Sequence, residues 1–278
     1  MKINLTLFLK MLKIKNEILI SEIIMNILKI RNLELGTGMP AICVSNTGKT
    51  KEEILSLTRK YLELPMDIME WRADWYENID DINKAKDILI DIRNILGDRP
   101  LLFTFRTTKE GGIHEIPVSK YISLNKSVAE TGLADLIDVE TFTGDEIVTD
   151  MITYIHAFEC KVLASNHDFI RTPSKDDILS RLCKMQDMGA DILKIAVMPQ
   201  CQNDVLTLLS ATEEMAHKQN CCPLVTISMS GLGSASRISG EIFGSCLTFG
   251  SGETASAPGQ IPAAALKEMI KTIHDSIK

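Results

Sequence analysis

The chain lacks the features that would place it among membrane, secreted or nucleic-acid-binding proteins. Charged residues such as Lys10, Lys13 and Glu17 interrupt the apolar stretches of the first two dozen residues. This excludes a membrane span and the apolar core of a signal peptide in that segment, and we expect no membrane partner. Basic residues are not in surplus, since 30 lysines and arginines stand against 37 acidic residues, a net charge of −7 at pH 7. A nucleic-acid partner is therefore not expected either, because phosphate backbones require a basic face.

Cysteine spacing excludes a disulfide framework and a zinc site. The seven cysteines are an odd number without paired spacing, and Cys221 and Cys222 are adjacent, which suits neither a C-x-x-C motif nor a local bridge. We expect most of them to be small buried residues in a protein of a reducing, cytoplasmic compartment.

Nucleotide-binding loops are also missing where they would be needed. No G-x-G-x-x-G follows the first expected strand, and no G-K-[ST] follows the glycines between residues 231 and 244. These glycines are more typical of a flexible loop that lets backbone approach a ligand. Neither a nucleotide cofactor nor a metal is expected.

From residue 41 onward, the chain repeats one strand–helix unit. Eight segments have the apolar character of buried strands: 41–45, 67–72, 101–106, 136–140, 162–167, 192–197, 224–229 and 246–249. Helical periodicity lies between them, as at 51–62, 81–96, 174–188 and 205–218. Eight such units are the number that closes a (β/α)₈ TIM barrel, an α/β fold; a doubly wound open sheet is the alternative.

The chain divides into a short extension and one domain. Residues 25–278 are expected to form the barrel, opened by a short strand pair that begins at Met25. Residues 1–24 form an irregular extension that contains none of the candidate site residues. Met25 is an alternative start of the chain, and we expect the barrel not to require the extension.

Lys194 is the most informative residue, because it lies inside a run of apolar residues that otherwise has the pattern of a buried strand. Strand side chains alternate between faces, so Ile192, Lys194 and Ala196 point one way and Leu193 and Ile195 the other. Burial lowers a lysine pKa toward the neutral, nucleophilic amine, as in Schiff-base enzymes. A strand-end lysine that extends its head group to water is the alternative.

Other strands place polar side chains at the same mouth of the barrel. The same alternation pairs Glu70 with Arg72, Thr104 with Arg106, Asp138 with Glu140 and Ser165 with His167, each near a strand's carboxyl end. Active sites of these barrels occupy that end. The pattern therefore predicts a catalytic mouth, although Arg72 and Arg106 could instead be structural partners of Glu70 and Asp138.

These residues also lie in motifs that carry a family resemblance. The motifs are Glu70-Trp-Arg-Ala-Asp74, Phe105-Arg-Thr107 with Glu110-Gly-Gly112, Ser165-Asn-His-Asp-Phe169, Lys194-Ile-Ala-Val-Met-Pro199, Ser228-Met229, Ser236-Arg237 with Phe243-Gly-Ser245, and Ser256-Ala-Pro-Gly-Gln260. Seven motifs in register from about Met25 to the C-terminus resemble type I 3-dehydroquinase. The resemblance implies a lyase that dehydrates 3-dehydroquinate to 3-dehydroshikimate in the shikimate pathway, on the way to chorismate and the aromatic amino acids.

The resemblance assigns roles to individual residues. Lys194 would form the imine with the small-molecule substrate, and His167 would be the general acid and base. Arg237 would hold the substrate carboxylate in a bidentate fork. The remaining substrate-binding residues are Glu70, Arg72, Arg106, Ser256, Gln260 and Ser45, and the supporting residues are Glu110, Asp138, Met229 and Phe249. Glu110 resembles the acid that orients the histidine, and cationic neighbours would lower the pKa of Lys194 further.

Two other functions remain open from the sequence. A class I aldolase uses the same barrel and the same lysine chemistry to cleave a C–C bond, although it commonly needs a phosphate site where this chain has Arg237. A non-enzymatic carboxylate-binding module would keep Arg237 and Gln260 without needing Lys194 and His167 together. Fold alone decides neither case. The sequence does not define the oligomeric state, and a homodimer is the assembly to consider.

Overall fold

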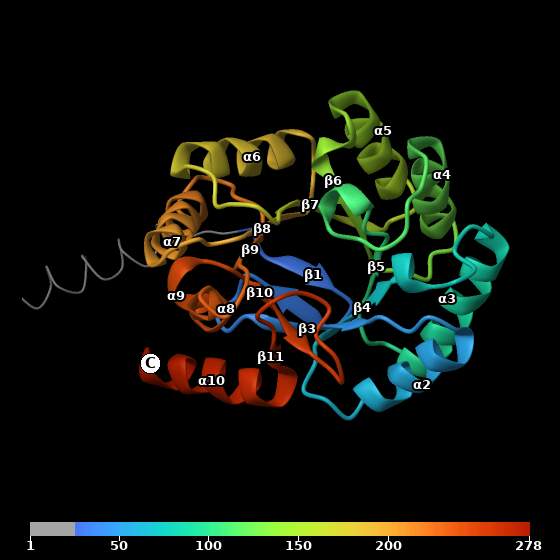
Figure 1. Ribbon diagram of the computed structural model, residues 1–278, viewed down its shortest axis with the longest axis horizontal. Helices are drawn as coiled ribbons and strands as arrows, with labels where there is room; N and C mark the ends of the chain where they lie inside the picture. Colours follow the sequence, from blue (N-terminus) through green and yellow to red (C-terminus); the bar gives the residue numbers. More distant parts are fainter. Residues whose placement is uncertain (1–25) are drawn as a thin grey trace, which may run out of the picture.

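Parallel strands alternate with helices along the computed structural model, which describes residues 26–278 (Figure 1). The strands of the barrel are β3 (Ala41–Asn46), β4 (Ile68–Arg72), β5 (Leu101–Thr104), β6 (Leu136–Glu140), β7 (Lys161–Asp168), β8 (Ile192–Val197), β9 (Leu224–Ser228) and β10 (Leu247–Ser251), with a short β11 (Ile261–Pro262) beside β10. The helices are α2 (Lys51–Tyr61), α3 (Ile82–Leu96), α4 (Val118–Ala129), α5 (Asp145–His156), α6 (Lys175–Asp187), α7 (Gln202–Ala216), α8 (Ser234–Ile238), α9 (Gly240–Phe243) and α10 (Ala263–Ser276). Short 3₁₀ turns are η1 (Ala73–Trp75), η2 (Thr108–Glu110) and η3 (Thr141–Thr143).

The sheet curls into the predicted (β/α)₈ barrel. Neighbours from β3 to β9 pair in chain order, and β10 pairs with β3, all in parallel. The ring closes where Leu224 of β9 forms a parallel bridge with Ser245 and accepts a 2.8 Å hydrogen bond from the backbone of Cys246. The alternative of an open doubly wound sheet is wrong, because such a sheet would leave β9 and β10 apart as edges.

Side-chain alternation separates two apolar cores. In β8, Ile192 and Ala196 belong to the cluster inside the barrel, whereas Leu193 and Ile195 belong to the cluster between the barrel and its helices. The predicted facing of Lys194 into the barrel interior is thereby confirmed. Both neighbouring clusters consist of buried apolar side chains, so a polar side chain on the inner face can reach solvent only through the barrel mouth.

Local signals fix most helix ends. Thr50, Asp81 and Ser174 accept hydrogen bonds from the first backbone N–H groups of α2, α3 and α6, as expected for N-caps. The helix expected at 205–218 instead begins at Gln202, because the Asp204 carboxylate accepts a 2.7 Å bond from the Gln200 backbone and organises a polar first turn. That turn has no apolar periodicity. The strand expected at 101–106 ends at Thr104, and the backbone N–H of the residue at 106 turns toward the Asp74 carboxylate, 3.4 Å away.

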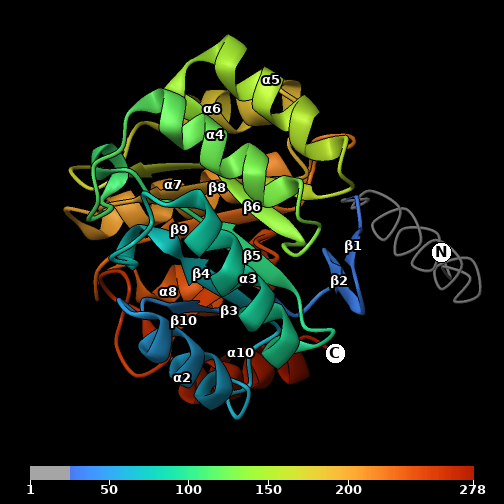
Figure 2. The same cartoon turned by 90° about the vertical axis from the view of Figure 1, so that its right-hand side faces the viewer.

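The predicted strand pair is an antiparallel hairpin that closes the amino-terminal end of the barrel (Figure 2). Its strands are β1 (Leu28–Ile30) and β2 (Leu33–Leu35). Ile30 and Leu35 are buried in the same apolar cluster as Leu102 and Leu136 of the barrel interior. Arg31 at the hairpin turn donates a 2.6 Å hydrogen bond to Asp135, which joins the hairpin to the base of β6.

The expected extension, residues 1–24, lies outside the described residues, so the division of the chain at Met25 stays a prediction. Among residues 26–278, the structure contains no helix with both the length and the apolar character that crossing a bilayer demands.

We expect Leu35→Ala to lower the free energy of unfolding by about 2–5 kcal/mol, because it opens a cavity under the barrel interior. The measurement is urea unfolding followed by circular dichroism. Leu206→Ala removes the same atoms from a residue that is 63% exposed on α7, and serves as the matched control with little expected change. Equal midpoints for Leu35→Ala and the control would show that the hairpin does not contribute to barrel stability.

Candidate active site

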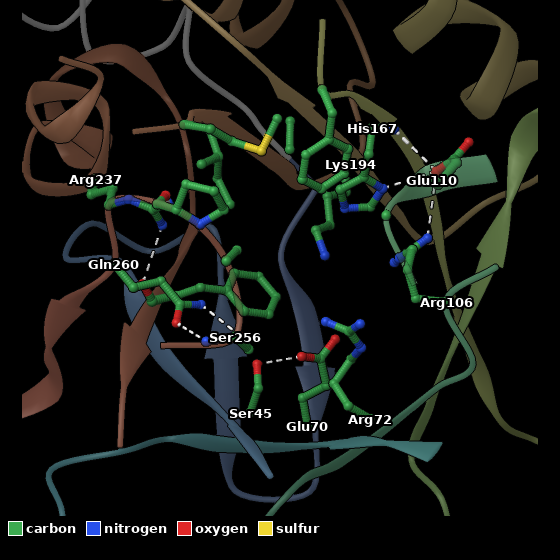
Figure 3. A pocket seen from close by; sticks show the side chains of 18 residues that line it. Ser45, Glu70, Arg72, Arg106, Glu110, His167, Lys194, Arg237, Ser256 and Gln260 are labelled. Carbon is green, nitrogen blue, oxygen red and sulfur yellow. Dashed lines mark hydrogen bonds and ion pairs between the residues drawn. The ribbon is translucent and has the colours of Figure 1, made fainter. Parts of the chain in front are cut away.

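A cavity of about 180 Å³ opens at the carboxyl ends of the barrel strands (Figure 3). It brings together nearly all the site residues that the sequence predicts: Ser45, Glu70, Arg72, Arg106, Glu110, His167, Lys194, Met229, Arg237, Phe249, Ser256 and Gln260. Asp138 does not line the cavity; it is fully buried beside it, within reach of both Lys194 and Arg106.

Lys194 projects from β8 into the middle of this cavity (Figure 3). The residue is 4% exposed; its Nζ lies 3.9 Å from Asp138 Oδ2 and 4.3 Å from the centre of the Phe249 ring. Burial is the main cause that lowers the Lys194 pKa, and it outweighs the carboxylates of Asp138 and Glu70, which raise it. The amine is thus shifted toward its neutral, nucleophilic form.

The expected help from cationic neighbours is only partly right. Arg106 does lower the pKa of Lys194, but its effect ranks behind those of the two carboxylates, which act in the opposite direction. Alternation along a strand showed that these charged side chains share the barrel mouth, but not which of them lies nearest to the amine.

His167, at the end of β7, is held by Glu110. Its Nδ1 lies 2.9 Å from Glu110 Oε2, and its backbone N–H donates to the same oxygen at 3.1 Å. An Nδ1 engaged by a carboxyl oxygen leaves Nε2 as the ring nitrogen that, within the described residues, has no protein partner. Burial lowers the pKa of His167 well below its usual range, with Arg106 and Lys194 acting in the same direction, so the ring is a neutral base.

Burial also raises the pKa of Glu110 to about 8, an effect that the nearby Arg106 opposes. Glu110 comes from η2 and is 6% exposed. A carboxyl group with this pKa can hold or release a proton near neutral pH while it remains bonded to the imidazole.

Arg106 balances the negative charge on this side of the cavity. Its guanidinium donates to Asp138 at 2.6 Å, to Glu140 at 3.1 Å and to the Ser165 hydroxyl at 2.9 Å. The alternative pairing of Arg106 with Asp138 is therefore present. Glu140 also accepts two hydrogen bonds from Thr107, which ties β6 to the loop after β5. Strand alternation had placed Glu140 beside Asp138, but no feature of the sequence assigned it a role.

Arg72 is not paired with Glu70, and that alternative is wrong. Its guanidinium makes two 2.8 Å hydrogen bonds to Asp74, which the turn η1 brings back toward the strand end. Glu70 instead accepts hydrogen bonds from Ser45 and, at 2.8 Å, from Thr104. The two carboxylate oxygens of Glu70 thus link β4 to β3 and to β5 under the cavity.

Arg237 lies on the opposite side of the cavity from His167 and Glu110 (Figure 3). It is 1% exposed, and within residues 26–278 it contacts no carboxylate; it donates to the backbone oxygens of Phe249 at 3.3 Å and Pro258 at 2.9 Å. Its buried Nε has no hydrogen-bond partner in this part of the chain. Burial lowers the Arg237 pKa to about 10, so a cation remains at neutral pH without a counter-charge.

Ser256 and Gln260 face Arg237 from the loop after β10. The Ser256 backbone N–H donates to the Gln260 side chain at 2.8 Å, and Gln260 Nε2 donates to the Ser256 hydroxyl at 2.9 Å. The two side chains stabilise each other and line the cavity beside Arg237. Partly buried polar side chains beside an unneutralised buried cation form a site for an anion such as a carboxylate.

Several lining residues were not predicted as site residues: Gly111, Phe169, Ala196, Ile227, Ala257 and Pro258. Ala196 carried a usable signal, since it lies two residues from Lys194 on the same face of β8, whereas Phe169 lies just beyond the end of β7, where strand alternation no longer applies. Ile227 and Ala257 are apolar residues that no polar pattern marks. Within the described chain, no cluster of three metal-binding side chains is present.

Comparisons with known proteins agree with the resemblance in the motifs. The family profile of type I 3-dehydroquinase matches residues 42–277. The 3-dehydroquinate dehydratase of Clostridium botulinum (strain Eklund 17B / Type B) is 51% identical over 251 residues, which cover 90% of this chain and 99% of that protein.

Solved structures show the same likeness. The crystal structure of type I 3-dehydroquinate dehydratase from Clostridium difficile with covalent modified comenic acid has a TM-score of 0.88 at 47% identity, covering 91% of this chain and 99% of that one. The 3-dehydroquinate dehydratase of Geobacillus kaustophilus HTA426 has a TM-score of 0.87 at 34% identity, with 91% and 98% covered.

The raised pKa of Glu110 leads to a pH-dependent stability. Between its ordinary pKa of 4.5 and the folded value of about 8, the unfolded chain releases this proton and the folded protein keeps it. The contribution of protonated Glu110 to the free energy of unfolding is therefore fully present below pH 4.5, and it is lost as the pH rises toward 8. Glu110→Gln abolishes this titration, so we expect the unfolding free energy of the variant minus that of the parent to increase steadily from pH 5 to pH 8.

Urea unfolding at four pH values measures this difference. Glu115→Gln, at an exposed position five residues further along the chain, is the matched control and should give a constant difference. A constant difference for Glu110→Gln as well would mean that the carboxyl group ionises in the folded protein as it does in the unfolded chain.

Proposed function

The chain belongs to the type I 3-dehydroquinase family of hydro-lyases, and we propose that it dehydrates 3-dehydroquinate to 3-dehydroshikimate in the shikimate pathway through a Schiff base on Lys194. The observation that carries this proposal is the position of the Lys194 amine. It is buried in a cavity that has an unneutralised arginine on one side and a histidine–carboxyl pair on the other.

Substrate binding begins with the carboxylate. The guanidinium of Arg237 can donate two N–H bonds side by side, and its buried Nε has no partner within residues 26–278, which favours a bidentate fork to a carboxylate. Ser256 and Gln260 add hydrogen bonds at the same end. Pairing with the substrate carboxylate neutralises the buried Arg237 cation and is therefore favourable. This pairing holds the substrate ring in place and so directs its ketone toward Lys194.

Lys194 supplies covalent catalysis. Its neutral amine adds to the substrate ketone, and loss of water gives an iminium whose positive nitrogen attracts electrons. The adjacent C–H bond becomes acidic because the electron pair left behind is delocalised into the iminium. Asp138, 3.9 Å from Nζ, provides a negative charge that stabilises this cation.

His167 moves the protons. Its neutral ring accepts the proton from the carbon next to the iminium, and the resulting imidazolium donates a proton to the hydroxyl that departs as water. Glu110 holds Nδ1, so that Nε2 performs both transfers. A final water hydrolyses the imine, which releases the enone product and restores the Lys194 amine.

The other polar lining residues are proposed to orient the ring hydroxyls. Glu70, Arg72 and Arg106 offer charged acceptors and donors on the floor and on the His167 side of the cavity, and Ser45 is fixed by its hydrogen bond to Glu70. Met229 and Phe249 supply apolar contact to the ring carbons. No cofactor takes part in this scheme.

A cytoplasmic location is part of the proposal. All seven cysteines are unpaired, and four of them are buried, which suits a reducing compartment. Assembly as a homodimer stays a prediction from the sequence.

Borohydride reduction with 3-dehydroquinate is the direct test of the Schiff base. We expect intact-mass analysis to show one reduced adduct per chain and peptide mapping to place it on Lys194, because among the lysines of residues 26–278 only this one is buried and lines the cavity. Lys194→Ala should lose both the adduct and turnover while it still binds ligand at Arg237. Active protein without an adduct, or an adduct on another lysine, would refute covalent catalysis by Lys194; binding without turnover by the parent would identify a carboxylate-binding module.

His167→Ala should still form the reducible adduct but stall afterwards, because imine formation depends chiefly on the amine, whereas C–H cleavage needs the base. Removal of a general base typically costs about 10²–10⁴-fold in kcat, and loss of a group used twice should reach the upper part of that range. Steady-state kinetics and the same trapping assay measure the two effects separately. Near-parental turnover would rule out this role for the imidazole.

Arg237→Lys keeps a positive charge but removes the fork. We expect KM for 3-dehydroquinate to rise and kcat to fall, since a misplaced ring reacts slowly even when it binds. Lys175→Arg, the reverse exchange at the partly exposed first residue of α6, away from the cavity, controls for general effects of the substitution. If the kinetics of Arg237→Lys match those of the parent, the carboxylate binds elsewhere.

A further inference from the structure

Phe169 lines the cavity next to the proton-transferring histidine, and the chemistry proposed above gives it no task. It follows His167 by two residues, just after the end of β7. Its ring lies nearly parallel to the imidazole, with 21° between the planes and 6.3 Å between the ring centres, within the range of favourable offset pairs. Phe169 is 38% exposed, whereas the His167 side chain is only 10% exposed. The phenyl ring therefore covers the imidazole toward solvent.

The neighbouring turn is shaped to receive this ring. Gly111 has a φ of +85°, a left-handed conformation that favours glycine, and a Cβ added there would stand 2.4 Å from two atoms of the Phe169 ring. The residue before it, Glu110, bonds to His167 Nδ1. One turn thus holds the imidazole by its edge through Glu110 and provides, through Gly111, the space in which Phe169 lies against it.

Charged groups surround the imidazole on its other sides. Glu110 faces it from η2, Arg106 from the segment after β5, Arg72 from the end of β4 and Lys194 from β8. The three cations lower the pKa of His167 together with burial. Water at the ring would screen these charges, so the cover that Phe169 provides controls how strongly they act.

We propose that Phe169 is a positioning residue for His167: its ring holds the imidazole in the orientation set by Glu110 and keeps bulk water away from it. The inference rests on the proposed function, because it concerns the histidine that moves the protons. It adds a residue whose contribution is made through another side chain rather than through the substrate.

The test compares Phe169→Ala with Phe169→Tyr and the parent enzyme, using 3-dehydroquinate. In Phe169→Ala, kcat should fall by about 10–10²-fold through misplacement of the base, with a much smaller change in KM because the carboxylate site at Arg237 is untouched. The acidic limb of the kcat/KM profile should move to higher pH, since a hydrated His167 regains a higher pKa. Phe169→Tyr keeps an aromatic ring at this position, so its kcat and the acidic limb of its kcat/KM profile should match those of the parent.

Ile170→Ala is the control, because this neighbouring apolar side chain is 79% exposed and does not line the cavity. It should match the parent. A parental kcat in Phe169→Ala, an acidic limb that stays in place, or a tyrosine variant as impaired as the alanine variant would each overturn the positioning role. Turnover and borohydride trapping of the parent enzyme report on the proposed function itself, so a failure there is distinct from a failure of the inference about Phe169.

Discussion

The buried guanidinium of Arg106 holds together the charged side of the barrel, and the properties of the other groups depend on it. It is 3% exposed and joins carboxylates from β6 to the hydroxyl of Ser165 on β7. Buried carboxylates are costly unless a cation and hydrogen bonds compensate them. Arg106 supplies the cation and the hydrogen bonds for Asp138 and Glu140, and it lowers the pKa of both Glu110 and His167. Loss of that one cation would therefore raise the pKa of Glu110 and of His167, in addition to removing its hydrogen bonds.

The two sides of the cavity differ in how far their charges are satisfied. Near Arg106 one guanidinium already pairs with three carboxyl groups, and the hydrogen bonds are already made. Near Arg237 the protein supplies a cation and leaves its Nε without a partner in the described chain. A ligand with one carboxylate can relieve the second imbalance but would worsen the first. The charge distribution thus orients such a ligand in a single direction before any contact with Lys194 forms.

Much of this arrangement follows from two periodicities in the sequence. Strand alternation with eight repeated units predicts the barrel, the inward facing of Lys194 and the gathering of Glu70, Arg106 and His167 at one mouth. What alternation cannot provide is the path of the chain after a strand ends. The turn η1 returns Asp74 to Arg72, for which the sequence had offered Glu70 as an alternative structural partner, and the turn after η2 sets Gly111 against Phe169. Such contacts depend on the dihedral angles of short loops, which one sequence does not specify.

The hairpin of β1 and β2 limits the route by which water and product enter and leave the cavity. Ile30 and Leu35 close the amino-terminal end of the barrel with apolar side chains. Within the described chain, the cavity therefore opens only at the carboxyl ends of the strands. The proposed reaction sheds one water when the imine forms and another at the elimination, and consumes one at the end. All three must pass the same opening that the six-membered ring occupies. The covalent bond to Lys194 keeps the ring inside while water comes and goes, and the product leaves only after the last water has entered.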